Sequence, residues 1–455
     1  MNDTQAPSQT NAAASADKAA ADPMATRRAA LQILTTVLDK GQPLDQALEN
    51  SNAFLSLPEA RDRAFVRMMV TTCLRRMGQI DDLIKRASAR PDQPISPPLL
   101  QHILRLGITQ IVFMDVPDHA AVNTTVTLTD ENRLSRTKGF VNAMMRNIAG
   151  QGRDWTARQD IPRLNTPDWI LQTLVKDYDL RTAIDILQCH IQEAPLDMTM
   201  RQPSQARDFA EHIDGTVLPN GTVRIARAQG RIEDMAGYTD GHWWVQDAAA
   251  SLPAKLFGIV KDALIIDLCA APGGKTAQLA SAGAHVIALD RSARRLARFR
   301  ENMKRLNLTD LVTTEAADAS VWMPNVPADG VLLDAPCTAS GTLRKRPDVA
   351  WLKTPADLAT MVEQQKRLLE NAAKLLKPTG CLVYSTCSLF KDEGERQIEN
   401  FLKHHKDFAR DPINASEIGG LTECISVVGD IRILPYHLKD QGGMDGFYAA
   451  RLRRK

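Results

Sequence analysis

Apolar residues recur at helical spacing over the first third of the chain. They repeat every three to four positions from residue 25 onward, as in the run Ala30, Leu31, Leu34, Val37 and Leu38. This spacing places them on one face of an α-helix, where they can pack into a core. Short Pro-rich segments separate several such stretches, because proline ends helices. The pattern therefore predicts an all-α domain over residues 25–152.

A different pattern follows this region. The segments Leu196–Arg201 and Thr222–Ala226 alternate apolar and polar residues, and a helical stretch at about 203–213 lies between them. Alternation with a period of two is typical of half-buried strands. We therefore expect residues 153–250 to form a small α+β connector.

From about residue 251 to the C-terminus, short apolar runs alternate with helical stretches at about 292–306, 355–376 and 392–404. Runs that are apolar on both faces are typical of parallel strands covered by helices on either side. The alternation predicts an α/β fold with a doubly wound, Rossmann-like sheet over residues 251–455. The predicted strands are Leu264–Leu268, Val286–Asp290, Val312–Glu315, Gly330–Asp334, Gly380–Thr386 and Gly446–Leu452.

Composition narrows the class of protein. Of the 455 residues, 44% are hydrophobic and 24% are charged, as in soluble globular proteins. No apolar run approaches the ~20 residues of a membrane-spanning helix. The seven cysteines have neither zinc-ligand spacing nor the density of a disulfide framework. We expect a cytoplasmic protein with free thiols, a monomer without a bound metal or membrane contact.

Residues 1–24 differ from the rest of the chain. They are mostly Ala, Ser, Thr, Gln, Asn and Asp, with no apolar periodicity. Such a segment has too little apolar surface to offset the entropy lost on ordering. We therefore expect a disordered tail.

Two cysteines follow predicted buried strands and have the most specific surroundings in the sequence. Cys337 lies in the segment Asp334-Ala-Pro-Cys, and Cys387 lies in the segment Tyr384-Ser-Thr-Cys-Ser. The carboxyl ends of parallel strands meet at one edge of the sheet, where open α/β folds bind ligands. Cysteine is often only a small buried hydrophobe. The polar neighbours of both residues favour reactive thiols instead.

Basic residues gather in clusters, although the net charge is only +2. One cluster, Arg344–Arg346, directly follows the Cys337 loop. Charged runs are more often solvated surfaces than binding sites. The position of this cluster beside a reactive loop nevertheless favours contact with phosphate groups.

A third loop at the same predicted edge has the composition of a nucleoside-binding loop. The segment Asp267–Thr276 leaves a strand and enters a helix, and its residues Gly273 and Gly274 allow positive φ and a close approach of the backbone to a ligand. The dinucleotide pattern G-x-G-x-x-G is absent. A phosphate-binding P-loop is also excluded, because Cys269 occupies the position of its first glycine.

Acidic residues at the predicted strand ends indicate the cofactor. Asp290 ends the second strand, where a carboxylate accepts hydrogen bonds from ribose hydroxyls. Asp318 follows the third strand and can accept from an adenine amine, and Asp334 ends the fourth. With Asp267, these carboxylates suit a cationic nucleoside, S-adenosylmethionine, rather than a polyphosphate. The predicted contacts are Cys269, Ala270, Ala271, Pro272, Gly273, Gly274, Lys275, Asp290, Asp318 and Asp334.

A thiol pair beside a methyl donor indicates a specific reaction. C5 of cytosine is a weak nucleophile, but attack of a thiolate at C6 gives an enamine whose C5 can take the methyl group. The C5 proton then leaves and the thiol is eliminated, so the site needs a nucleophilic cysteine, a carboxylate near N3 and a group that assists release. Cys387, Cys337 and Asp334 supply these groups. Lys275 either orients Asp334 through a salt bridge or lowers a thiol pKa.

These segments resemble those of the Nol1/Nop2/Sun family of RNA cytosine-5 methyltransferases. The likeness lies in Asp267–Lys275, Asp334–Gly341, Arg346–Asp348, Tyr384–Ser388, Gln246–Ala248 and Met444–Phe447. The resemblance implies that Cys387, the cysteine of Thr-Cys, is the nucleophile. It also implies that Cys337, the cysteine of Pro-Cys, assists product release.

The helical region resembles the NusB family in Arg61–Arg63, Arg105–Gly107 and Arg136–Asn147. This resemblance implies an RNA-binding domain in front of the methyltransferase domain. The combination implies an enzyme that uses S-adenosylmethionine to methylate C5 of a cytosine in 16S rRNA.

Three alternatives stay open. A tRNA cytosine-5 methyltransferase would share the same catalytic segments. A DNA cytosine-5 methyltransferase would use the Pro-Cys thiol as nucleophile. Such an enzyme has no neighbouring Thr-Cys loop and contains an inserted target-recognition domain, whereas this chain has the loop and lacks the insertion. A non-catalytic NusB-like RNA-binding factor would account for the helical region and leave the remaining two thirds of the chain without a role.

Overall fold

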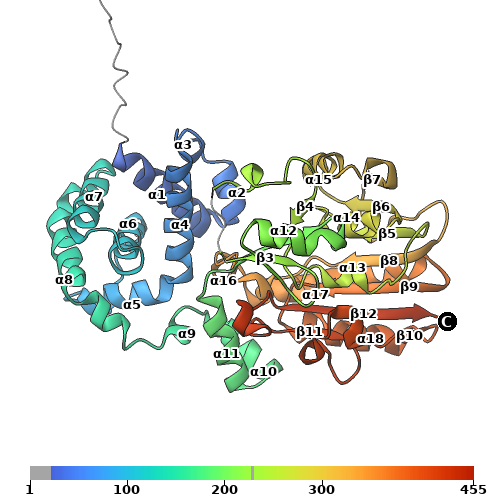
Figure 1. Ribbon diagram of the computed structural model, residues 1–455. Coiled ribbons are helices and arrows are strands. Elements are labelled where there is room, and N and C mark those ends of the chain that lie inside the picture. The colour runs from blue at the N-terminus through green and yellow to red at the C-terminus, as the bar shows by residue number, and fades with distance from the viewer. Residues whose placement is uncertain (1–21, 227–229) are drawn as a thin grey trace, which may run out of the picture.

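The structure is a computed structural model that describes residues 22–226 and 230–455. A helical N-terminal region lies at one side of the molecule, and a large sheet with helices on its faces lies at the other (Figure 1). Residues 1–21 of the predicted tail lie outside the described residues. Within the described ranges, no helix has both the length and the apolar character needed to cross a bilayer.

The N-terminal region consists of helices, as the apolar spacing predicts. Its first helix begins at Pro23, and Asp22 caps it by accepting a hydrogen bond from the backbone N–H of Met24. Helical structure therefore begins before the predicted tail ends. Apolar side chains such as Leu34 and Ile103 are fully buried in one shared core. The helices are α1 (Pro23–Lys40), α2 (Leu44–Glu49), α3 (Asn52–Leu55), α4 (Ala60–Arg75), α5 (Met77–Ala87), α6 (Pro98–Ile108), α7 (Asp118–Glu131) and α8 (Lys138–Thr156).

A small α+β unit follows three further helices. Its antiparallel sheet has the strand order β2-β3-β1-β4. Met198, Val223 and Trp243 are buried between this sheet and α12. The helix α8 runs past residue 152, where the sequence predicts a boundary between domains. The elements are α9 (Ile161–Leu164), α10 (Asp168–Asp177), α11 (Leu180–His190), β1 (Leu196–Met200), α12 (Ala206–His212), β2 (Thr216–Val217), β3 (Val223–Ile225) and β4 (Trp243–Val245).

The large sheet has the order β10-β12-β9-β8-β5-β6-β7, and β11 pairs with β12. The strands from β7 to β9 in this order are parallel, whereas β12 and its partners are antiparallel. All six predicted strands are present, and β10 and β11 were not predicted. The elements are α13 (Leu252–Lys255), β5 (Leu264–Leu268), α14 (Gly274–Ser281), β6 (His285–Asp290), α15 (Ala293–Arg305), β7 (Val312–Ala316), β8 (Ala328–Asp334), α16 (Val349–Leu352), α17 (Pro355–Lys374), β9 (Leu376–Thr386), α18 (Glu395–His404), β10 (Phe408–Arg410), β11 (Ile431–Ile433) and β12 (Phe447–Arg454).

Helices cover both faces of the large sheet, which confirms the predicted doubly wound fold. Ala277 of α14 and Phe299 of α15 are buried in the core on one face. Leu368 of α17 and Phe401 of α18 are buried in the core on the other. The chain passes from β5 toward β6 on one side and later returns to β8 on the other, so the carboxyl end of β5 is the topological switch point, where such folds bind ligands.

The helical region contacts the large domain directly. Nε1 of Trp351 donates a hydrogen bond to the carbonyl oxygen of Leu74 over 2.8 Å. Glu49 forms an ion pair with Arg298 of α15 at 2.9 Å. The first of these contacts joins α4 to α16, just after the Cys337 loop, and the second joins α2 to α15. The helical region is therefore packed beside the catalytic edge of the sheet.

Candidate active site

The carboxyl ends of three neighbouring parallel strands bring the predicted loops together. The strand β8 pairs with β5 on one side and with β9 on the other, in a register that places Leu268 opposite Leu333 and Asp334 opposite Ser385. The chain therefore leaves all three strands at the same level of the sheet. The cofactor loop, the Cys337 loop and the Cys387 loop meet at this edge, as the sequence predicts.

The two predicted catalytic thiols face each other. Sγ of Cys337 and Sγ of Cys387 lie 3.4 Å apart, and both residues are partly exposed. The hydrogen bond to Cys387 raises the pKa of Cys337, and burial and the charge of nearby Glu393 raise it further. These causes favour the neutral thiol form of Cys337 beside the neighbouring sulfur. The pair can supply one nucleophile and one proton carrier.

Lys275 and Asp334 form the predicted salt bridge. Nζ of Lys275 lies 2.7 Å from Oδ2 of Asp334, and the hydroxyl of Ser385 donates to Oδ1 over 3.0 Å. The Lys275 ammonium also lies 5.3 Å from the centre of the Phe447 ring, which is a cation–π distance. Both oxygens of Asp334 are thus held at the start of the loop that contains Cys337.

The two glycines of the cofactor loop have different roles. Gly273 has a φ of 108°, and a Cβ atom there would lie 2.8 Å from Cδ2 of Phe299. Gly274 is the first residue of α14 and does not adopt the predicted positive φ. Its small size instead lets Gln246 and Trp244 approach, because a Cβ atom would lie 3.3 Å and 3.4 Å from their side chains. One glycine makes the turn, and the other leaves room for the connector.

Two of the predicted carboxylates are buried. Burial raises the pKa of Asp267 to about 7, although Thr276 donates a hydrogen bond to its Oδ2. Asp290 is buried at the end of β6 and forms an ion pair with Arg295 at 3.2 Å. Oδ1 of Asp267 accepts no hydrogen bond, whereas Oδ2 of Asp290 is the oxygen paired with Arg295. Oδ1 of Asp267 is therefore available to a donor on a ligand.

Asp318 lies apart from the other carboxylates. It is exposed, and it accepts hydrogen bonds from the hydroxyl and the backbone N–H of Ser320 in its own loop. These bonds lower the pKa of Asp318, the bond from the hydroxyl being the larger cause. The predicted contact of Asp318 with an adenine amine stays a prediction.

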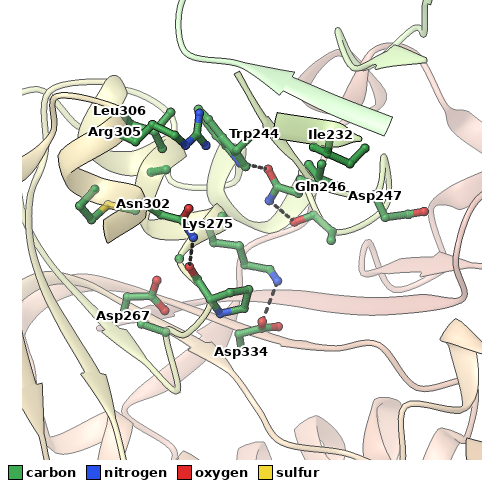
Figure 2. Close-up of a pocket in the computed structure, with 18 of the residues that line it drawn as sticks. Ile232, Trp244, Gln246, Asp247, Asp267, Lys275, Asn302, Arg305, Leu306 and Asp334 are labelled. Carbon is green, nitrogen blue, oxygen red and sulfur yellow. Dashed lines mark hydrogen bonds and ion pairs between the residues drawn. The ribbon is translucent and has the colours of Figure 1, made fainter. Parts of the chain in front are cut away.

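A cavity of about 330 Å³ opens beside Lys275 and Asp334 (Figure 2). Of the predicted residues, those that line it are Asp267, Ala270, Pro272, Gly273, Gly274, Lys275 and Asp334. Those that do not line it are Cys269, Ala271, Asp290, Asp318 and the two catalytic cysteines. The remaining wall comes from the connector and the C-terminal end of α15, and it includes Trp244, Gln246, Asp247, Asn302 and Arg305. Apart from Gln246 and Asp247, which belong to the resembling segments, no sequence signal marks this wall.

The predicted phosphate contact of the Arg344–Arg346 cluster is wrong for Arg344. Its side chain is buried, and its Nη1 donates to a backbone carbonyl oxygen over 2.7 Å. The neighbouring Lys345 pairs with Asp247 and, at 3.1 Å, with Asp445. Burial raises the pKa of Asp445 to about 6, and two buried carboxylates in contact require a cation beside them. This part of the cluster therefore joins the connector to the C-terminal segment.

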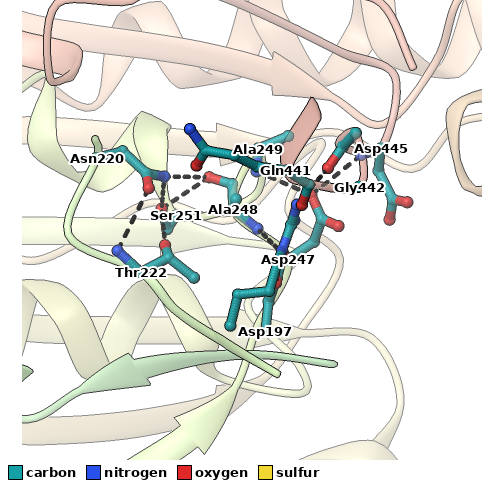
Figure 3. A network of polar contacts seen from close by, with 12 residues as sticks. Asp197, Asn220, Thr222, Asp247, Ala248, Ala249, Ser251, Gln441, Gly442 and Asp445 are labelled. Atoms are coloured by element: carbon teal, nitrogen blue, oxygen red, sulfur yellow. Dashed lines mark hydrogen bonds and ion pairs between the residues drawn. The ribbon is translucent and has the colours of Figure 1, made fainter. Parts of the chain in front are cut away.

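A polar network fixes the connector at the cavity (Figure 3). Oδ2 of Asp197 accepts from the backbone N–H of Ala248 over 2.9 Å, and Nδ2 of Asn220 donates to the carbonyl oxygen of Ala248 over the same distance. Both oxygens of Asp197 also pair with Arg224, at 2.6 and 2.7 Å. Because the two residues before Ala248 line the cavity, this network sets their position.

Two family models match separate parts of the chain. Residues 24–150 match the NusB family, and residues 255–453 match 16S rRNA methyltransferase RsmB/F. The first match covers the helical region, and the second covers the large α/β domain.

Curated relatives match nearly the whole chain. A probable ribosomal RNA small subunit methyltransferase B from Synechocystis sp. is 34% identical over 432 residues, which cover 90% of this chain and 94% of the relative. A ribosomal RNA small subunit methyltransferase B from Vibrio cholerae is 31% identical over 448 residues, which cover 95% and 98%. Among solved structures, PH0851 covers 96% of this chain and 100% of its own, with a TM-score of 0.72 at 23% identity. This structural likeness confirms the fold.

Asp267 makes the stability of the protein depend on pH. Its raised pKa means that the folded state favours the protonated form, so this stabilisation is full below the unfolded pKa of 3.8 and is lost as the pH rises through about 7. At about 1.4 kcal/mol per pKa unit, the effect can reach about 4 kcal/mol. Asp267→Asn should remove it, so that the unfolding free energy of the wild type falls relative to the variant from about pH 4 to pH 7. Urea unfolding measures the unfolding free energies of the wild type and of the variant. A difference between them that stays constant from about pH 4 to about pH 7 would contradict the raised pKa of Asp267.

Asp197→Ala should loosen the connector from the C-terminal segment, because Asp197 holds Arg224, which donates to the carbonyl oxygens of Gln441 and Gly443 over 2.7 Å each. The change leaves Arg224 buried without a carboxylate, and breaking such a pair costs about 3–5 kcal/mol. The side chains of this pair are only 1% and 5% exposed. Asp160→Ala is the matched control, because its pair with Arg163 is 57% exposed on both sides and should change stability by less than about 1 kcal/mol. Denaturant unfolding compares the two, and equal small losses would show that the buried pair does not hold the connector.

Proposed function

Because the chain belongs to the family of ribosomal RNA small subunit methyltransferase B, we propose that it transfers a methyl group from S-adenosylmethionine to C5 of a cytosine in 16S rRNA. The contact of two thiols at 3.4 Å is the observation that supports this proposal most directly. Methylation of a nitrogen or oxygen needs no thiol, whereas methylation at C5 needs covalent activation of the ring. The thiol pair therefore favours carbon methylation.

The buried acceptors of the site fit S-adenosylmethionine. Oδ1 of Asp267, a residue that lines the cavity, lacks a hydrogen-bond donor, and the cofactor has hydroxyl and ammonium groups that can supply one. The cavity beside Lys275 and Asp334 gives space for its amino-acid part. When bound, the cofactor supplies an electrophilic methyl group on a sulfonium. The surrounding carboxylates suit its positive charge.

The two thiols divide the covalent chemistry between them. The thiolate of Cys387 forms a bond to C6, and the ring electrons move toward C5 and N3. The family resemblance assigns this attack to Cys387, and the raised pKa of Cys337 disfavours its thiolate form. Once C5 is methylated, the C5 proton leaves, the ring recovers its C5–C6 double bond and the C6–S bond breaks. In this step Cys337 gives its thiol proton to the departing sulfur of Cys387 and takes up the C5 proton in its place, so that both cysteines end as thiols.

Asp334 is the carboxylate that we infer to lie near N3 and to accept a hydrogen bond from the exocyclic amine of the cytosine. A carboxylate accepts from the amine, which uracil lacks, so it can distinguish the two bases. Lys275 and Ser385 already hold both oxygens of Asp334. Because these contacts already restrain the carboxylate, it loses less conformational entropy when the base binds.

The RNA partner is inferred from the relatives and from the helical region. The named relatives act on small subunit ribosomal RNA, whereas nothing observed here favours tRNA. A DNA-type mechanism, with Cys337 as the nucleophile, is disfavoured because the named relatives act on ribosomal RNA. We further propose that the protein acts in the cytoplasm as a monomer, with the NusB-like region holding the RNA.

Asp290→Ala should weaken the binding of S-adenosylmethionine by about 1–3 kcal/mol, which is the usual cost of losing a hydrogen bond to a charged group. Asp310→Ala is the control, because Asp310 is an exposed carboxylate just before β7. Isothermal titration calorimetry measures both affinities. An unchanged affinity for Asp290→Ala would remove Asp290 from the cofactor site.

Substitution of each thiol should give a different product. Cys387→Ala should give neither methylation nor a covalent RNA adduct, while cofactor and RNA still bind. Cys337→Ala should still attack and methylate the base, and then stall as an enzyme–RNA adduct that survives denaturing gel electrophoresis. The reason is that only Cys387 forms the C6 bond, whereas Cys337 is needed to break it.

Two further variants complete this test. The double variant should form no adduct, and Cys381→Ala, which removes a buried thiol from β9, should behave as the wild type. An adduct with Cys387→Ala and none with Cys337→Ala would exchange the two roles and favour the DNA-type mechanism.

A further inference from the structure

Glu393 is a fully buried carboxylate beside the two thiol loops. It ends the short turn Lys391–Glu393, between the Cys387 loop and α18, and it is 0% exposed. Acidic side chains are rarely buried to this extent unless their charge has a partner. The partners of Glu393 are hydrogen-bond donors rather than a cation.

Hydrogen bonds connect this carboxylate to both thiol loops. Oε1 accepts from the backbone N–H of Thr338 over 2.9 Å, and Oε2 accepts from the hydroxyls of Thr338 and Ser388 over 2.5 Å each. Thr338 directly follows Cys337, and Ser388 directly follows Cys387. One side chain therefore holds the residue after each thiol.

A third element holds the carboxylate from its other side. Nε2 of Gln365 on α17 donates to Oε1 of Glu393 over 3.0 Å and to the carbonyl oxygen of Pro336 over 2.9 Å. Pro336 precedes Cys337, so Gln365 joins the carboxylate to the same loop a second time. All the bonds to the carboxylate come from donors, which favour its ionised form, although burial raises the pKa of Glu393.

We propose that Glu393 is a positioning residue for both catalytic thiols, and that its carboxylate fixes the separation of the two sulfurs by tying their loops together. Without this tie, the loops keep direct contacts only on the side of Ser340 and Gly341, and the residues next to the two sulfurs could shift relative to each other. The two sulfurs would then no longer face C6 and C5 of one base at the same time. The expected effect on catalysis rests on the proposed function, whereas the expected effect on the separation of the two sulfurs does not.

Glu393→Gln is the sharpest substitution, because it keeps the size of the side chain. It removes the negative charge that strengthens the four hydrogen bonds to the carboxylate. The hydroxyls of Thr338 and Ser388 must also turn to accept from the new NH₂ group, so the tie between the loops is weakened. We expect kcat to fall about 100-fold, the effect of a displacement of about 1 Å in a reacting pair. The KM values for RNA and for S-adenosylmethionine should change by less than about 2-fold, because Glu393 contacts neither ligand. Glu399→Gln, an exposed change on α18, is the control and should match the wild type.

A second readout follows the sulfur separation without any need for activity. Diamide oxidises two adjacent thiols to a disulfide, and the two hydrogens pass to diamide to give a hydrazine. At 3.4 Å, Cys337 and Cys387 should form this bond quickly in the wild type. We expect Glu393→Gln to slow its formation at least about 10-fold, because separated loops rarely bring both sulfurs into contact. Peptide mass spectrometry identifies the bond, and the rates are measured well below the melting temperature of each protein.

The outcomes separate the possible failures. A lower melting temperature with unchanged kcat and an unchanged disulfide rate would overturn the positioning role and leave only a structural one. If Glu393→Gln does not fold, Ser388→Ala removes the tie to the Cys387 loop alone and should slow disulfide formation in the same direction; an unchanged rate would overturn the proposal. If the wild type neither binds the cofactor nor methylates RNA, the proposed function fails, while the disulfide rates still decide the role of Glu393.

Discussion

The short distance between the sulfurs of Cys337 and Cys387 is the constraint on which the rest of the site depends. Parallel pairing of β8 with β9 brings both loops to one edge, but it fixes the backbone only as far as the strand ends. Beyond them, contacts between the loops take over, such as the hydrogen bond of 3.0 Å from the Gly341 N–H to the Cys387 carbonyl oxygen. Gly341 is required there, because a Cβ atom would lie 1.9 Å from the carbonyl oxygen of Gly446.

Two other parts of the chain complete the site without supplying a thiol. The connector forms one wall of the cavity, and Arg224, which pairs with Asp197, joins it to the C-terminal segment through the carbonyl oxygens of Gln441 and Gly443. The helical region packs against α15 and α16, so RNA held by that region would lie near the catalytic edge. Each of these parts has its own core, and each also packs apolar side chains against the large domain: Trp351 lies against the helical core, and Trp244 of the connector belongs to the core of the large domain. Buried polar contacts between the parts add to this packing. The stability of buried polar contacts depends on their geometry more than on the surface area that they bury, because an unpaired buried charge is costly.

The sequence allowed the fold and the meeting of Cys337 with Cys387 to be predicted, because the carboxyl ends of parallel strands always share one edge. It did not reveal the direction in which Arg344 points, because that direction depends on Asp445, which is distant along the chain. Glu393 was missed for a related reason. Polar residues surround it in sequence, as in an exposed turn, and only the packing of α17 and two loops buries it. Local patterns thus predict elements and edges, whereas partners of buried charges appear only in three dimensions.

Peptide mapping of a trapped complex tests the central claim most directly. RNA with 5-fluorocytosine at the target position has fluorine in place of the C5 proton that must leave, so the bond between sulfur and C6 should persist after methylation. After digestion of protein and RNA, mass spectrometry identifies the peptide that carries the nucleotide. We predict a methylated nucleotide attached to Cys387. Attachment to Cys337, or the absence of any adduct with RNA that the enzyme methylates when unmodified, would contradict this account.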